Sequence, residues 1–199
     1  MYVRDAKNRE EVWLLDRLDE LSIEDPAFRS RDYVVAIDET TGDKAGFGRI
    51  RVHPGEPEVC ELAAVGVLPE WRGQGVGAHV IERLIAHAGD AGFERVFAVT
   101  ESIDYLRQFG FDPAPTGDLP DAIKVRLDEI REEDPDAIAL AVDTDGFVMP
   151  DRLREAFKHA GRVDEATQDE PATSEEAETL TEEFGIDPDE ATYKYDTGR

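Results

Sequence analysis

The stretch Arg72-Gly73-Gln74-Gly75-Val76-Gly77 decides the fold, because it joins the apolar run Leu62 to Leu68 to the start of an amphipathic helix. Glycines let the backbone take positive φ and approach a ligand closely. The first turn of a helix presents free N–H groups, with the positive end of the helix dipole behind them. The pattern therefore predicts a phosphate site. The helix ends near Gly92, and its apolar face consists of Val76, Val80, Ile81, Leu84, Ile85 and Ala88.

Three phosphate-binding motifs carry glycines at comparable spacing. A P-loop needs Gly-Lys-Ser/Thr at its end, and the sequence lacks it. A dinucleotide fingerprint is matched by Gly73, Gly75 and Ala78, although residues 69–72 separate it from the preceding strand. The third motif is R-x-x-G-x-G at Arg72, Gly75 and Gly77.

The third motif follows Ala64-Val65-Gly66-Val67-Leu68-Pro69 and precedes Tyr105-Leu106-Arg107-Gln108-Phe109-Gly110-Phe111, and together these stretches resemble the GNAT-type N-acetyltransferases. The resemblance implies an α/β (α+β) fold, with a mixed sheet of six to seven strands and helices on both faces. It also implies an N-acetyltransferase that uses acetyl-CoA as co-substrate. The cofactor-binding residues that it implies are Val65, Gly66, Val67, Arg72, Gly73, Gln74, Gly75, Val76 and Gly77.

The chain is strongly acidic. It holds 47 Asp and Glu against 22 Lys and Arg, for a net charge of −25, and only five of the basic residues are lysine. This charge repels polyanions, so we expect no nucleic acid partner. The acidic residues also occur within segments of good apolar periodicity, which argues against simple disorder. We therefore expect a cytoplasmic protein of a halophile, whose self-repulsion is screened by molar salt.

Size and residue types limit the class of protein further. The chain has 199 residues and 40% hydrophobic content, enough for one domain with a real core. We find no signal peptide, lipidation motif or membrane-spanning stretch, and expect no membrane partner. The lone Cys60 excludes an intrachain disulfide and is expected to be a small buried residue. The four histidines have no ligand spacing, and we expect no metal.

Apolar periodicity and turn residues predict the order of elements. Residues 62–100 are typical of a strand, a helix and a second, parallel strand, with the glycine turn at the carboxyl end of the first strand. Residues 32–38 and 45–52 predict a hairpin. The other predicted elements are strands at 2–4, 58–68, 93–100 and 137–142, and helices at 11–21, 103–109 and 119–132.

The character of the sequence changes after Asp145. We predict an acetyltransferase domain at 1–145 and an acidic C-terminal extension at 146–199, helical and partly disordered. Within the extension, 149–161 predicts a helix, and Thr173-Ser174-Glu175-Glu176 is a capping box for another. Residues 162–189 are interpreted either as a solvated tail or as a docked helix that Tyr193 and Tyr195 would anchor.

Two residues are candidates for catalysis, Glu61 and Tyr105. Glu61 lies fourteen residues before Gly75, where the resemblance implies a general base, and it would act on the amine through a water. Because 47 of 199 residues are acidic, a structural role competes with this one. The tyrosine that the resemblance implies as general acid falls at Leu106, so Tyr105 is offset by about 100° around the helix. We also expect Gly66 to form a bulge where the strands part.

Within the GNAT family, the sequence resembles most the acetyltransferase domain of N-acetylglutamate synthases, and this resemblance bears on which molecule accepts the acetyl group. It rests on residues 61–65, 96–100, 105–111 and 119–120. Those enzymes place an arginine for the substrate carboxylate where this chain has Glu101, so the local charge preference is reversed. We expect Glu101 to bind substrate, and the substrate to be a small primary amine. Two alternative functions stay open: an acetyltransferase for an amino acid, and a non-catalytic protein that binds acyl-CoA or a dinucleotide. In either case, the sequence does not decide whether the chain forms a homodimer.

Overall fold

The computed structural model describes residues 1–161. Its centre is a seven-stranded sheet in the order β1-β2-β3-β4-β5-β7-β6. The predicted hairpin and the strands around the glycine turn are confirmed. The short β6 was not predicted, because two residues give no periodic signal. The strands are β1 (Tyr2–Asp5), β2 (Tyr33–Ile37), β3 (Lys44–His53), β4 (Val59–Val67), β5 (Arg95–Thr100), β6 (Asp112–Pro113) and β7 (Ile138–Asp143).

The sheet is mixed. β4 and β5 run parallel, as expected for two strands joined through a helix, while β3 pairs antiparallel with β4 and β7 pairs antiparallel with β5. A dinucleotide fold would need a mostly parallel sheet at this point. The topology therefore matches the acetyltransferase expectation of six to seven mixed strands.

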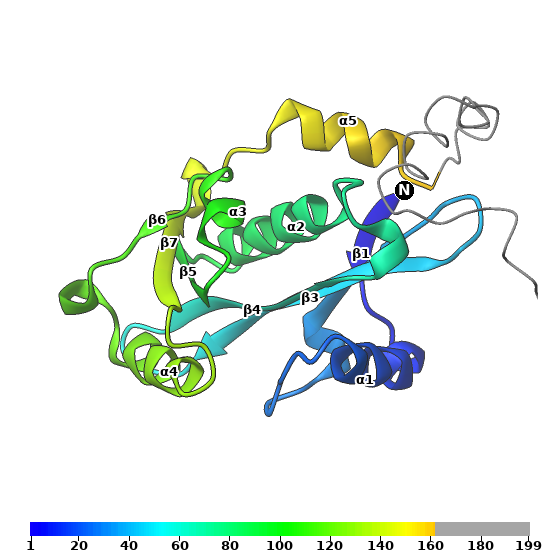
Figure 1. The fold of residues 1–199 in the computed structure, drawn as a ribbon. Helices are drawn as coiled ribbons and strands as arrows, with labels where there is room; N and C mark the ends of the chain where they lie inside the picture. The colour runs from blue at the N-terminus through cyan, green and yellow to red at the C-terminus, as the bar shows by residue number, and fades with distance from the viewer. Residues whose placement is uncertain (162–199) are drawn as a thin grey trace, which may run out of the picture. The chain divides into compact units, whose positions relative to one another are not determined.

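Helices cover both faces of the sheet (Figure 1). α2 lies on one face, and α1 and α4 lie on the other. The predicted helices are confirmed with shifted ends. Their bounds are α1 (Glu11–Glu20), α2 (Val76–Asp90), α3 (Ile103–Arg107), α4 (Asp121–Arg131) and α5 (Asp151–His159).

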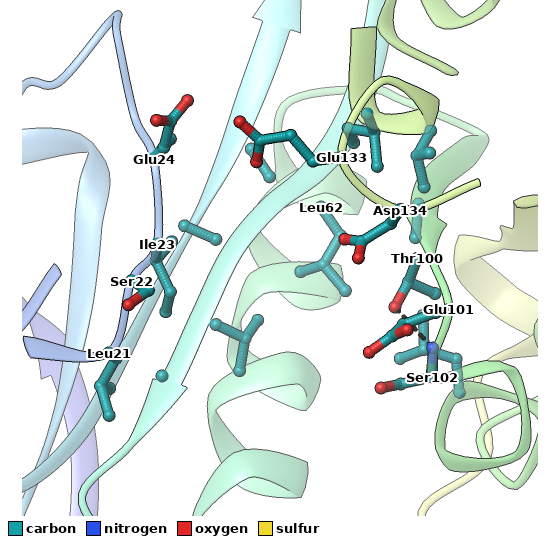
Figure 2. Close-up of a pocket in the computed structure, with 18 of the residues that line it drawn as sticks. Leu21, Ser22, Ile23, Glu24, Leu62, Thr100, Glu101, Ser102, Glu133 and Asp134 are labelled. Atoms are coloured by element: carbon teal, nitrogen blue, oxygen red, sulfur yellow. Dashed lines mark hydrogen bonds between the residues drawn. The ribbon is translucent and has the colours of Figure 1, made fainter. Parts of the chain in front are cut away.

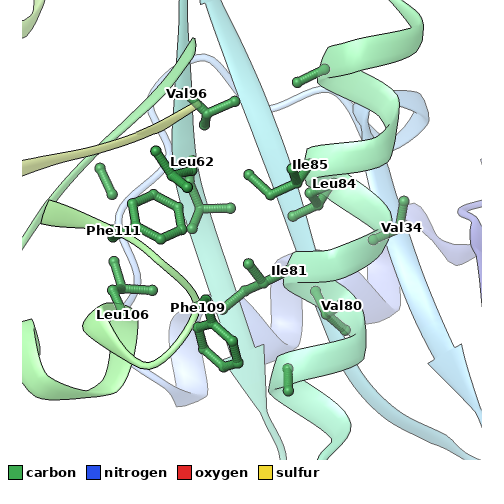
Figure 3. Packing of buried hydrophobic residues seen from close by; sticks show 14 of the residues in the cluster. Val34, Leu62, Val80, Ile81, Leu84, Ile85, Val96, Leu106, Phe109 and Phe111 are labelled. Carbon is green, nitrogen blue, oxygen red and sulfur yellow. The ribbon is translucent and has the colours of Figure 1, made fainter. Parts of the chain in front are cut away.

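The main core lies between α2 and the sheet (Figure 3). The apolar face read from the sequence is the buried face of α2. Leu106, Phe109 and Phe111, at and after the end of α3, close the same cluster. Burying each large side chain of this kind contributes roughly 1.5–3 kcal/mol. This core fixes the start of α2, and hence the glycine turn, against the ends of β4 and β5.

Smaller clusters hold the helices of the opposite face. α1 packs through Leu14 and Leu18 on β2 and β3, and α4 packs through Ile123 and Leu127 on β5 and β7. The two helices leave the middle of this face, over β4, between them.

The chain after residue 145 continues into α5, which packs on α2. Phe157 is buried in the main core cluster, so this part of the predicted extension is a docked helix. The domain boundary at residue 145 stays a prediction, and the capping box, Tyr193 and Tyr195 lie outside the described residues. Within residues 1–161, no helix is both long and apolar enough to cross a bilayer.

Candidate active site

The cleft begins where β4 and β5 part. These strands pair only at Cys60 with Val96 and at Glu61 with Phe97. Beyond these pairs, a cavity of about 1170 Å³ opens between the strand ends. The loop after α1 forms one wall, and α3 with the end of α4 forms another (Figure 2). The divergence leaves the backbone of residues 62–67 without a β5 partner, so its polar groups on that side are available to a ligand.

A β-bulge at Ala63 marks the start of the divergence. In the β3–β4 ladder, Arg49 pairs with Ala64 and Ile50 with Leu62, which makes Ala63 the extra residue. The predicted bulge at Gly66 is wrong, because Gly66 pairs regularly with Phe47. Gly66 serves packing instead. A Cβ atom there would lie 2.5 Å from the Phe47 ring.

The glycine turn is built to expose its backbone. Gly73 and Gly75 both have φ of +75°, a conformation that other residues adopt only with strain. Among the described residues, no hydrogen-bond acceptor is found for the N–H groups of residues 73–78. Consecutive free N–H groups at the start of a helix form a site for an anion such as a pyrophosphate. The turn lies directly beyond the end of β4, so the structure brings the predicted cofactor residues together.

Tyr105 reaches this junction in spite of its offset position. A Cβ atom at Gly77 would lie 2.8 Å from the Tyr105 hydroxyl oxygen and 3.2 Å from Val67 Cγ2. The Tyr105 ring packs edge-on against Phe109, with 5.3 Å between centroids. Burial raises the pKa of Tyr105, and the charge of Arg152 partly opposes this effect. The hydroxyl therefore keeps its proton at neutral pH, beside the diverging strands.

Glu61 is placed differently. Its side chain is 2% exposed and does not line the cavity. One carboxylate oxygen lies 2.6 Å from His53 Nε2 and 3.8 Å from an Arg51 nitrogen, and the other lies 3.5 Å from Arg126 Nε. Arg126 does line the cavity. Glu61 thus lies behind Arg126, within a buried cluster of charges.

This cluster continues into the loop after α1. Arg51 also pairs with Asp25 at 3.0 Å, and Arg49 pairs with the same carboxylate at 2.7 Å. The Tyr33 hydroxyl donates to Asp25 at 2.5 Å. Residues 21–24 and 26 form one wall of the cleft. The bonds of Asp25 to Arg49 and Arg51 therefore fix this wall to β3.

Comparison with known proteins decides the family. The model of the acetyltransferase (GNAT) family matches residues 2–111, more than half of the chain. The chain belongs to the GNAT family. The matched region contains the glycine turn, the diverging strands and Tyr105, and it ends before α4 and α5.

Curated relatives align with shorter stretches of this GNAT chain. A mycothiol acetyltransferase of Thermobifida fusca is 32% identical over 101 residues, or 45% of this chain and 31% of the relative. An amino-acid acetyltransferase of Aeromonas salmonicida is 35% identical over 66 residues, or 33% of this chain and 15% of the relative. The chain thus spans less than a third of the length of either protein.

Solved structures share the fold. An N-acetylglutamate synthase of Neisseria gonorrhoeae, complexed with coenzyme A and N-acetyl-glutamate, has a TM-score of 0.57 at 20% identity and covers 71% of this chain and 34% of its own. Rv2747 of Mycobacterium tuberculosis, in complex with CoA and NLQ, has a TM-score of 0.58 at 17% identity and covers 72% of this chain and 99% of its own. The GNAT fold predicted from the glycine motif is thereby confirmed.

The mouth of the GNAT cleft carries several carboxylates (Figure 2). Glu101 lines it at the end of β5, where the sequence places it. Glu133 and Asp134 follow α4 on the same side, and Glu24 stands on the opposite wall. Arg72 and Arg126 are the cationic side chains of the lining. The cavity therefore favours a cationic ligand near these carboxylates.

Two arginines could not be predicted from the sequence as neighbours of the candidate catalytic residues: Arg126, which lines the GNAT cleft, and Arg152, which acts on Tyr105. Arg126 was simply part of a predicted helix, and its contact with Glu61 depends on how α4 packs across β5. Arg152 lies on α5, outside the family match, and its position beside Tyr105 depends on the docking of that helix. No periodicity or motif in the sequence signals either position.

Proposed function

We propose that this chain transfers the acetyl group of acetyl-CoA to the primary amine of a small molecule. The observation that carries the proposal is the divergence of β4 and β5 beside a turn with consecutive free N–H groups. The unpaired edge of β4 suits the amide groups of an extended pantetheine arm, and the turn suits the pyrophosphate. Membership of the GNAT family supports the same assignment.

The thioester supplies an acetyl group to the neutral amine: a C–N bond forms, the C–S bond breaks, the amine loses a proton and the thiolate gains one. The chain must therefore hold both reactants in line and handle two protons. Tyr105 is our candidate for the proton donor. Its hydroxyl stands at the junction of β4 and α2, and its raised pKa keeps it protonated.

Glu61 is our candidate for the amine side of the cleft. Its carboxylate is on the face of β4 opposite α2, behind Arg126. Since the ion pairs prevent a direct approach, Glu61 would position the amine or accept its proton through a water. His53 lies within hydrogen-bond distance of the same carboxylate and would orient it.

The acceptor that we favour is cationic. Glu101, Glu133 and Asp134 would meet a substrate carboxylate with like charge, whereas a diamine or another cationic amine would be attracted. The curated amino-acid acetyltransferases support the alternative of an amino-acid acceptor, whose carboxylate Arg72 or Arg126 of the cavity lining would bind.

The test is a thiol-release assay with acetyl-CoA and a panel of diamines, polyamines, amino acids and peptides, run at low and at molar KCl. We expect release that depends on a primary amine, with the cationic amines ahead of glutamate. Tight CoA binding without release on any amine would favour a non-catalytic acyl-CoA-binding protein. The observation that favours a non-catalytic protein is the buried Leu106, which stands where the family has its tyrosine.

We also infer a high-salt cytoplasm as the working environment. The excess of acidic over basic residues and the low lysine content support this inference. In such a medium, the repulsion among carboxylates is screened within about 3 Å at 1 M salt. Homodimer formation stays open, and the molar mass in solution, measured by light scattering at molar KCl, would decide it.

A further inference from the structure

α5 lies outside the residues matched by the family model, yet it packs directly on the glycine turn. A Cβ atom at Gly75 would collide with the Leu153 carbonyl oxygen of α5. The His79 ring stacks on Phe157 with 3.8 Å between centroids. After the helix, the Gly161 N–H donates to the side-chain oxygen of Gln74 at 2.9 Å. The position of α5 relative to the turn is therefore set at three points.

This docking brings Arg152 to the cofactor side of the cleft. Arg152 is in the first turn of α5, and its guanidinium donates to the side-chain oxygen of Gln108. It also lies close enough to Tyr105 to lower the pKa of that hydroxyl against the effect of burial. Tyr105 in turn reaches Gly77 in the first turn of α2. A chain of contacts thus connects Arg152 to the turn.

The charge of Arg152 is not neutralised by a carboxylate within residues 1–161. Its neighbour Arg154, by contrast, pairs with Glu82 at 3.0 Å. Arg72, in the turn itself, likewise has no carboxylate partner in the described part of the chain and donates to the Val67 carbonyl. Arg72 belongs to the turn with the free N–H groups, and Arg152 is connected to it through Tyr105. In a protein with a net charge of −25, two arginines without a carboxylate partner at such a turn favour an anion there.

We propose that Arg152 binds a phosphate group of CoA, so that α5 is part of the cofactor site. This inference rests on the proposed use of acetyl-CoA. Guanidinium groups bind phosphate through paired N–H donors, and the bond with Gln108 leaves further donors of Arg152 for this purpose. The phosphate is either the 3′-phosphate or the pyrophosphate of CoA.

The experiment is calorimetric titration of the full chain with CoA, for wild type, Arg152→Ala, Arg152→Glu and the matched control Arg154→Ala. We expect Arg152→Ala to weaken binding about 10- to 100-fold, the range of a hydrogen bond to a charged group. Arg152→Glu should weaken it further, and Arg154→Ala should bind as wild type does. Thermal unfolding of each variant checks that α5 and the core remain folded.

Dephospho-CoA separates the two phosphates. If Arg152 binds the 3′-phosphate, wild type and Arg152→Ala will bind dephospho-CoA equally. If it binds the pyrophosphate, the difference between them will persist. Wild-type affinity for CoA in both Arg152 variants would overturn the inference and leave the proposed function intact, whereas a wild type that binds no CoA would overturn both.

Discussion

At the scale of the residue, the two proposed catalytic groups, Tyr105 and Glu61, lie on opposite faces of the sheet. Tyr105 contacts the glycine turn on the α2 side, and Glu61 is held among His53, Arg51 and Arg126 on the other side. One group would accept the proton of the amine, and the other would donate a proton to the leaving thiolate. Because the amine and the thiolate lie on different sides of the acetyl carbon, the two groups must be separate.

Replacing either residue should slow acetyl transfer without weakening CoA binding. A positioned general acid contributes about 100-fold or more, so Tyr105→Phe should lower kcat by about that factor. Glu61→Gln should instead raise the KM for the amine. Stopped assays over pH 6–10, with Tyr2→Phe as control, check this, and an unchanged kcat in Tyr105→Phe would remove Tyr105 from the reaction.

We expect Glu101 to influence which acetyl acceptor is preferred. Thr100 and Glu101 close β5 at the mouth of the cleft, and a carboxylate substrate placed there would meet a like charge at a cost of about several kcal/mol at close range. Glu101→Arg should therefore raise kcat/KM for glutamate and lower it for cationic amines. The control is Glu94→Arg, the same change at the start of that strand. If wild type acetylates glutamate efficiently and Glu101→Arg loses this activity, the charge argument is wrong.

At the scale of the element, the glycine turn and its helix could be read from the sequence, because both depend on local properties. Positive φ at Gly73 and Gly75, a glycine at the helix start and the apolar stripe of α2 require no knowledge of distant residues. The bulge at Ala63 and the orientation of Tyr105 depend on partner strands and on α3 packing, which local sequence does not report. The docking of α5 on α2 likewise depends on residues that are distant in the sequence.

The turn gives a direct element-scale prediction. Gly77→Glu places a side chain against Tyr105 and Val67 and a negative charge beside the phosphate site, so CoA affinity should fall by about 100-fold or more. Gly117→Glu is the matched control, since a Cβ atom there meets nothing within 4 Å. Both variants should keep the wild-type circular dichroism. Equal CoA affinity in the two folded variants would exclude the turn from the site.

Glu10 links β1 to the start of α1 and gives a pH prediction. Two hydrogen bonds from Arg4, at 2.7 and 2.8 Å, and one from the Lys7 N–H lower the pKa of Glu10 from 4.5 to about 2. A carboxylate with a lower pKa in the folded state stabilises the protein above about pH 4.5, and this contribution is lost as the pH falls toward 2.

Glu10→Gln should accordingly reduce the free energy of unfolding by about 2 kcal/mol at pH 7. The difference from wild type should shrink as the pH falls through 4 toward 2. Glu20→Gln is the control, because Glu20 pairs with Arg17 on the surface and should contribute less than about 1 kcal/mol. Urea titrations at fixed salt measure both variants. A difference that stays constant down to pH 2 would show that the stabilisation does not come from the charge of Glu10.

At the scale of the whole molecule, we expect the net charge of −25 to make stability depend strongly on salt. The core clusters are ordinary in composition, so the distinctive term is repulsion among surface carboxylates. The screening length falls from about 30 Å at 0.01 M salt to about 3 Å at 1 M. The melting temperature should therefore rise by more than about 10 °C between these concentrations of KCl, and not in sucrose of equal osmolality. A flat or falling melting temperature would contradict the halophilic interpretation.

We propose that acetyl transfer to an amine takes place in the cleft between β4 and β5. The most direct measurement is mass spectrometry of the reaction mixture after incubation with isotopically labelled acetyl-CoA and the best amine of the panel, for wild type and Gly77→Glu. We expect labelled acetyl on the nitrogen of the amine with wild type, one per thiol released, and almost none with Gly77→Glu. Thiol release without a labelled amine, or equal labelling by both proteins, would contradict it.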